Sequence, residues 1–258
     1  MKRRRTGLIV FGVIAVVMVA ERLWPLRKRR EESARHVARD AAMAMMSTAA
    51  MAAVQSIVQR AGTSRVEARG YTEARPLRLI AEILMLDYTL WLWHWLNHRV
   101  PLLWRFHRVH HVDLDLDAAT GARFHFGEMS LSVLFRLLQV RVIRPDPLAL
   151  SIWQTMLLSS IFFHHSNTRL PEDVDRAVAR VFVTPRMHGI HHSTAVDQTN
   201  SNFASLLTIW DAMHGVMRLD VPQEAITIGV PAYQEPEDVT VDRLIVMPLR
   251  PTDADWSA

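Results

Sequence analysis

The sequence contains no cysteine among its 258 residues. This absence excludes disulfides, and it excludes zinc, copper(I) and iron–sulfur sites that are built on thiolates. The H-E-x-x-H motif is also missing, which disfavours a zinc hydrolase. No basic stripe interleaved with aromatic residues is present, so we expect no nucleic-acid partner. No flavin, haem or iron–sulfur motif appears either, so any redox chemistry would need electrons from a partner.

Long uniform hydrophobicity is lacking as well, because the mean hydropathy is close to zero although half of the residues are apolar. The apolar residues are concentrated in runs separated by polar segments, a pattern that is typical of a membrane protein with polar ends. The first run is about long enough to span a bilayer, whereas the second could also be a soluble alanine-rich helix. The runs predict helices over residues 7–24, 41–58, 77–98, 131–143 and 148–163.

Histidine is abundant, with thirteen residues in the chain. Residues at i, i+3 and i+4 share one face of a helix, so clusters with this spacing direct several imidazoles to one place. Neutral imidazole is the commonest metal ligand, and eight ligands exceed what one ion can use. The sequence therefore predicts two metal ions close together. The clustered residues are His94 and His98, then His107, His110 and His111, and finally His188, His191 and His192.

These motifs, together with R123-F-H125-x-x-E128, H165-S-N167, N202-F and W210-D, resemble the membrane-bound fatty acid hydroxylase and sterol desaturase superfamily. The segment E21-R-L-W-P-L-R27 resembles a stretch common in bacterial members. The resemblance implies a non-haem di-iron centre that uses O₂ and external electrons to hydroxylate or desaturate a lipid. It implies ten ligands, with His164 as the second choice to His165: His94, His98, His107, His110, His111, His125, His165, His188, His191 and His192.

Six polar residues complete the predicted site. Asp87 lies two helical turns before His94, and we expect it to support a ligand histidine, with helix capping or a salt bridge to Arg78 as the alternative. The resemblance adds Glu128 and Asn167, and it gives Asp117 a hydrogen bond to a ligand imidazole. It also gives Asn202 and Asp211 a role in orienting ligands, for which ordinary capping is the alternative.

The expected fold is all-α: an integral membrane bundle of about four spanning or re-entrant helices, with a histidine-rich di-metal site in a cap at one membrane face. We expect membrane anchor helices and a basic loop in residues 1–76, the catalytic domain in 77–218 and a polar tail in 219–258. We expect a loop between Arg60 and Arg78, and an amphipathic surface helix over residues 170–186.

Seven Lys/Arg between Arg22 and Arg39, against four before the first helix, place the first loop in the cytoplasm. The histidine site would then face the cytoplasm from the cell's inner membrane. A silent lipid- or metal-binding protein of the same fold is the alternative function, and a metal transporter is disfavoured because the ligands gather at one face.

Overall fold

Helices make up the regular structure of this protein. The computed structural model describes residues 2–60, 75–252 and 255–256. Of the loop expected between Arg60 and Arg78, residues 61–74 lie outside the described residues, and helix begins already at Pro76. Within the described residues, extended pairing is limited to three isolated bridges, Pro25 with Thr168, Phe182 with Leu207, and Ser193 with Ile228. The all-α prediction is therefore confirmed for this part of the chain.

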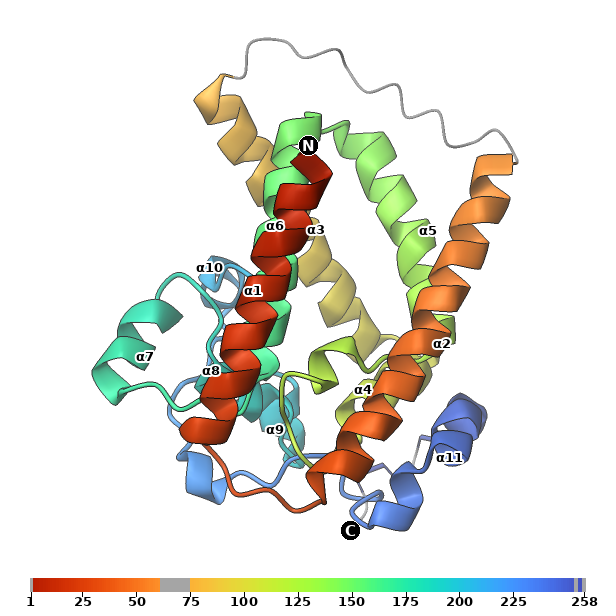
Figure 1. The fold of residues 1–258 in the computed structure, drawn as a ribbon, viewed down its shortest axis with the longest axis vertical. Helices are drawn as coiled ribbons and strands as arrows, with labels where there is room; N and C mark the ends of the chain where they lie inside the picture. The colour runs from red at the N-terminus through yellow and green to blue at the C-terminus, as the bar shows by residue number, and fades with distance from the viewer. Residues whose placement is uncertain (1, 61–74, 253–254, 257–258) are drawn as a thin grey trace.

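Five long helices rise from a layer of shorter ones (Figure 1). Helix α2 packs on α5, whereas α1 and α3 both pack on α6. Proline stands at the start of α3 and of α6, where its missing N–H costs nothing. The long helices are α1 (Lys2–Leu23), α2 (Ser33–Arg60), α3 (Pro76–Arg99), α5 (Phe126–Ile143) and α6 (Pro147–His165).

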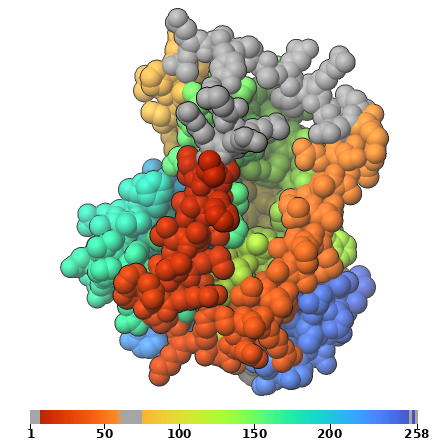
Figure 2. Space-filling view, viewed as in Figure 1, coloured from red at the N-terminus to blue at the C-terminus, as the bar shows by residue number. Residues whose placement is uncertain are grey.

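The long helices expose apolar side chains along much of their length. By length and composition, one stretch among the described residues, Ser33–Val58 of α2, could cross a membrane, and most of it is not buried inside the protein. Helix α1 forms part of the same surface (Figure 2), and its exposed large apolar side chains include Leu8, Ile9, Phe11, Val16, Val19 and Leu23. The number of spans stays a prediction.

The lower layer carries α4 (Pro101–His111), α7 (Glu172–Ala179), α8 (Pro185–His191), α9 (Val196–Thr199), α10 (Ile209–Met213) and α11 (Val241–Val246). The amphipathic helix expected over residues 170–186 is shorter, because α7 ends at Ala179 and α8 begins with Pro185. An extended Thr184 separates the two helices and caps α8 with its side chain.

The C-terminal segment, expected to be a polar tail, packs against α4. Leu244 and Met247 are fully buried in one cluster with Val109. The fully buried Arg108 donates to the carbonyl of Met247 and pairs with Asp255 at 2.6 Å. Helix α4 is thus held between the long helices and the C-terminal segment.

Candidate metal centre

Nine buried or nearly buried histidines converge in two adjacent groups where the long helices meet the lower layer. Within each group, one nitrogen from every ring lies within 4.8 Å of the others. Group 1 consists of His94, His98, His107, His111 and His191, and group 2 consists of His110, His165, His188 and His192. The two groups share a border, since the rings of His111 and His192 stack with centroids 4.3 Å apart.

Helical spacing explains how the groups are assembled. Helix α3 supplies an i, i+4 pair to group 1, and the C-terminal end of α6 supplies His165 to group 2. Each H-x-x-H-H motif is divided between the groups. Helix α4 gives His107 and His111 to group 1 and His110 to group 2, whereas the motif at α8 gives His188 and His192 to group 2 and His191 to group 1.

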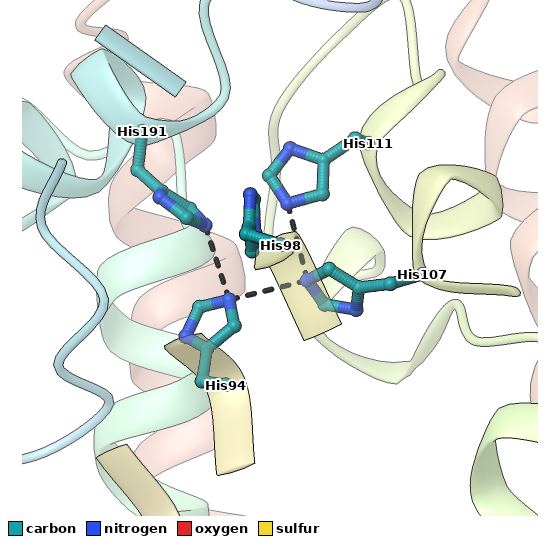
Figure 3. A group of neighbouring side chains, drawn as sticks. All are labelled: His94, His98, His107, His111 and His191. Atoms are coloured by element: carbon teal, nitrogen blue, oxygen red, sulfur yellow. Dashed lines mark hydrogen bonds between the residues drawn. The ribbon is translucent and has the colours of Figure 1, made fainter. Parts of the chain in front are cut away.

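In group 1 the rings point at one another from three helices (Figure 3). The Nε2 atom of His94 lies 3.1 Å from that of His107 and 3.1 Å from that of His191. The Nε2 atoms of His107 and His111 are 3.2 Å apart. The Nε2 atom of His98 is buried and has no hydrogen-bond partner among the described residues.

The contacts of the Nδ1 atoms, which face away from the centre of the group, show which nitrogen of each ring carries the hydrogen. A carbonyl or carboxylate oxygen can only accept, so each Nδ1 that lies against one must carry the hydrogen. A neutral imidazole has one N–H, and its Nε2 is then a bare lone pair. The three Nδ1 acceptors of His94, His107 and His191 are, in turn, the carbonyl of Phe203 at 2.6 Å, a carboxylate oxygen of Glu128 at 2.8 Å and the carbonyl of Ser201 at 2.7 Å.

Group 2 repeats the arrangement. His110 donates its Nδ1–H to the carbonyl of Arg123 at 2.9 Å, and His165 donates to the carbonyl of Ile161 at 2.8 Å. Their bare Nε2 atoms lie 3.0 Å apart. The Nε2 atom of His188 lies 3.0 Å from that of His165 and 3.1 Å from that of His192.

Bare lone pairs at these distances repel unless a cation stands between them. Protons are poor candidates, because burial lowers the pKa of His191 to about 3, against the opposing effect of its bond to Ser201. Burial also lowers the pKa values of His110, His111, His188 and His192 well below the ordinary range. A metal with nitrogen ligands at about 2.0–2.1 Å and right angles would set those nitrogens about 3.0 Å apart. The two groups therefore fit two metal ions.

One predicted ligand, His125, lies outside both groups. Its Nδ1 accepts from the backbone N–H of Gly127 at 2.9 Å and caps the start of α5, while its Nε2 donates to the carbonyl of Ile245 at 3.1 Å. Both nitrogens are occupied, so we withdraw His125 from the ligand set. His164 is also outside the groups, and its Nδ1 lies 3.4 Å from the hydroxyl of Ser160.

Glu128 is placed as a supporting residue. It is buried at the start of α5, and its Oε1 accepts a hydrogen bond from the Nδ1–H of His107. A carboxylate on the outer nitrogen of a ligand histidine fixes the ring orientation and raises its basicity. Its second oxygen is buried without a partner in the described part of the protein.

Asp87 and Asp211 bind tryptophans and backbone, and neither contacts a ligand ring. Asp87 accepts from Trp210 at 2.7 Å and from the backbone N–H of Leu207 at 3.2 Å. Asp211 accepts from Trp91 at 2.7 Å and from the N–H of Phe203 at 2.9 Å. Because the carbonyl of Phe203 holds His94, Asp211 acts on the metal site through that backbone segment. Burial raises the pKa of Asp211 to about 7.

Asn202 stands between the two carbonyls that hold His191 and His94. Its φ of 53° is in the left-handed region, which asparagine tolerates better than most residues. Its side chain donates to the carbonyls of Met187 and Arg218 and accepts from the N–H of Arg218. The residue thereby anchors this segment to α8.

Asp117 bonds no ligand imidazole, contrary to prediction. Its carboxylate lies 2.9 Å from Arg29 and 3.3 Å from the Nδ1 of His36. Asp113 lies 3.0 Å from the other nitrogen of His36 and 2.8 Å from Arg123. Since Asp113 follows the α4 histidines and the Arg123 carbonyl holds His110, this buried ionic network, which sequence reasoning missed, ties α2 to group 2.

Asn167 likewise positions the chain and makes no bond to a ligand ring. Its side chain accepts from the N–H of Arg27 at 2.8 Å and donates to the carbonyl of the same residue at 2.8 Å. The backbone N–H groups of Asn167 and Ala118 both bind one oxygen of Glu21. The 21–27 motif therefore fastens the end of α1 beside His165, a role that the motif's presence in the sequence could have indicated.

Comparison with known proteins accounts for this arrangement of histidines. The sequence model described as fatty acid hydroxylase matches residues 79–216, which hold all nine converging histidines. The chain belongs to the fatty acid hydroxylase family. Membership and the apolar helix α2 indicate that the protein associates with membranes.

Relatives in this superfamily include enzymes that act on different lipids. The chain is 33% identical over 138 residues to cholesterol 25-hydroxylase of Mus musculus, covering 53% of this chain and 45% of that protein. It is 23% identical over 244 residues to an ornithine lipid hydroxylase of Rhizobium tropici, covering 87% of this chain and 70% of the relative. It is 30% identical over 132 residues to alkylglycerol monooxygenase of Xenopus tropicalis, covering 51% of this chain and 28% of that protein.

The matched segment thus spans less than half of cholesterol 25-hydroxylase. No solved structure matches the chain significantly.

Proposed function

We propose that this protein is a membrane-bound non-haem di-iron oxygenase that hydroxylates a lipid, using O₂ and electrons from a redox partner. The observation that carries the proposal is the convergence of ring nitrogens from nine histidines in two adjacent groups. An all-histidine donor set suits iron as well as zinc and copper, and the hydroxylase and monooxygenase relatives favour iron. Their names also favour hydroxylation over desaturation.

Bound iron would supply the activation of O₂ and the removal of hydrogen from an unactivated C–H bond. The chain's own residues hold the ring orientations, through Glu128 and through the carbonyls of Ser201 and Phe203. Aromatic side chains shield group 1 from water. The ring of Phe203 lies 5.1 Å from that of His98, and the ring of Trp104 lies 5.4 Å from that of His111.

The lipid would approach from the bilayer between the apolar long helices, with the metal site facing the cytoplasm from the inner membrane. Two relatives are named for the lipids that they hydroxylate, ornithine lipid and cholesterol, and these two lipids are the starting candidates for the substrate class. The longer alignment, to the bacterial relative, makes an amino-acid-containing or other polar bacterial lipid the first candidate.

The test compares lipid extracts from cells that express the protein with extracts from cells that express His191→Ala, both grown under isotopically labelled O₂. We expect a lipid that carries one labelled oxygen atom with the native chain alone. Elemental analysis of the purified native protein should find two irons per chain. Metal-loaded protein without any labelled lipid would refute the oxygenase proposal and favour a silent metal-binding relative.

A further inference from the structure

Helix α10 exposes two large apolar side chains on one of its faces. Ile209 is 49% exposed and Met213 is 69% exposed. Because the two residues are four apart, their side chains lie on the same face of the helix. We call these two side chains the α10 patch. The position of α10 on the long helices indicates what lies against it.

The segment that carries the patch is docked on the middle of two long helices. Trp210 donates to Asp87 of α3 at 2.7 Å. Leu206, which precedes α10, packs in one cluster with Trp153 and Leu157 of α6. Figure 1 shows α10 beside the middle of α6, above α7 and α8. The patch therefore lies well above the other short helices of the lower layer.

This height on the long helices is within the thickness of a membrane. The hydrocarbon core of a bilayer is about 30 Å thick, which corresponds to about 20 residues of α-helix. Helix α3 begins at Pro76, at the end remote from the histidine groups. A length of about 20 residues from there extends past Asp87 and Trp91, which both bond to α10. A bilayer that covers α3 to this depth also reaches the patch.

The neighbouring long helices expose apolar side chains at a similar height. Met85 of α3 is 46% exposed, and Leu158 of α6, which follows the buried Leu157, is 43% exposed. The α10 patch thus continues an apolar surface that the long helices already present, and the same solvent should contact all of it.

The acidic residues of the short helices separate α10 from its lower neighbours. Helices α7 and α9 expose carboxylates, since the side chains of Glu172 and Asp197 are 54% and 69% exposed. The acid of α10, Asp211, is fully buried and accepts from Trp91 and from the backbone N–H of Phe203. A carboxylate at membrane depth is costly unless it is bonded inside the protein in this way. Helix α10 therefore has the polarity expected of a helix beside lipid.

We propose that the α10 patch contacts the lipid bilayer, with Ile209 and Met213 inserted among the acyl chains or at their boundary with the headgroups. Two side chains are too few for a stable protein interface, which takes about 20–30 residues on each side. The proposal rests on the association of the protein with membranes. It does not depend on the oxygenase activity.

The test uses the absence of cysteine from the chain, because Ile209→Cys and Met213→Cys each introduce a single thiol for a bimane fluorophore. The labelled, metal-loaded full chain is placed in phosphatidylcholine discs. Its emission is measured with a nitroxide-bearing phosphatidylcholine in the bilayer and, separately, with iodide in the water. We expect the lipid quencher to lower the emission of both variants at least about twofold, because a helix in the interface buries its apolar face about 5–10 Å deep. Iodide should have little effect.

Two controls bracket this result. Leu158→Cys, on α6, should respond to the lipid quencher as the patch does. Val196→Cys replaces an apolar residue of α9 that is 47% exposed, nearly the same as Ile209, and it should respond to iodide instead. Helical circular dichroism equal to that of the native chain confirms the fold of each variant. Iodide quenching of Ile209→Cys and Met213→Cys without lipid quenching would overturn the proposal. Protection from both quenchers would place the patch against another protein chain and would equally overturn it.

Discussion

The contact between Glu128 and His107 offers a direct test of the metal assignment. The two side chains are buried and their Oε1 and Nδ1 atoms are 2.8 Å apart. Removing such a carboxylate from the outer nitrogen of a ligand typically lowers metal affinity about 10- to 100-fold, or about 1.4–2.7 kcal/mol. We expect this loss in Glu128→Ala. Glu128→Gln keeps an oxygen that can accept from Nδ1, so its loss should be less than about tenfold.

The assay equilibrates iron-loaded protein with increasing chelator and measures the iron that remains per chain. His107 belongs to group 1, so the Glu128→Ala curve should shift most for the iron of that group, and by a smaller amount for the iron of group 2, because the two groups share ligands on α4 and at α8. Glu237→Ala, at an exposed position, controls for loss of a carboxylate elsewhere. Native-like retention of all the iron in Glu128→Ala, with the helical circular dichroism unchanged, would refute the assignment of His107 as a ligand.

Three further predictions follow from the same geometry. His191→Ala should lose iron, whereas His125→Ala should keep two irons and lose thermal stability, because its ring caps a helix; elemental analysis and melting curves of the two variants would contradict this if the effects were reversed. Asp117→Ala should destabilise the fold by about 3 kcal/mol, because it leaves the buried His36 and the partly exposed Arg29 without this carboxylate; metal affinity should change less than tenfold, as measured by denaturant unfolding and the chelator assay. The apoprotein should lose stability as pH falls below about 6.5, because the unfolded chain then binds protons on its histidines while His191 stays neutral in the fold down to about pH 3; a melting temperature independent of pH between 8 and 5 would show that the rings are not buried neutral.

The helices and the two ligand groups could be predicted from the sequence because both depend on local spacing. His94 and His98, or His107 and His111, share a helix face wherever the helix is placed, so convergence needs only that the helix ends meet. The apolar runs gave the long helices in the same way, although α2 begins at Ser33, well before the run that starts at residue 41. Between that start and residue 41, His36 and Arg39 both bind Asp113, which lies 77 and 74 residues further along the chain.

Distance along the chain explains what could not be predicted. His125 has the residue type and neighbours of a ligand, but its ring direction is set by Gly127 and by Ile245, which is 120 residues away. His36 lies outside the predicted histidine clusters, yet it is fully buried against Asp113, 77 residues further on. The orienting role of Asp211 is likewise indirect, through the backbone at Phe203.

The division of each H-x-x-H-H motif between the two groups has a consequence for assembly. Helices α4 and α8 each place three imidazoles on a rigid frame, two for one ion and one for the other. An ion bound in either group fixes the axial rotation of both helices, and so it brings the remaining ligands of the neighbouring group into place. The two ions should therefore load cooperatively, and neither group can be inherited or removed as a separate module.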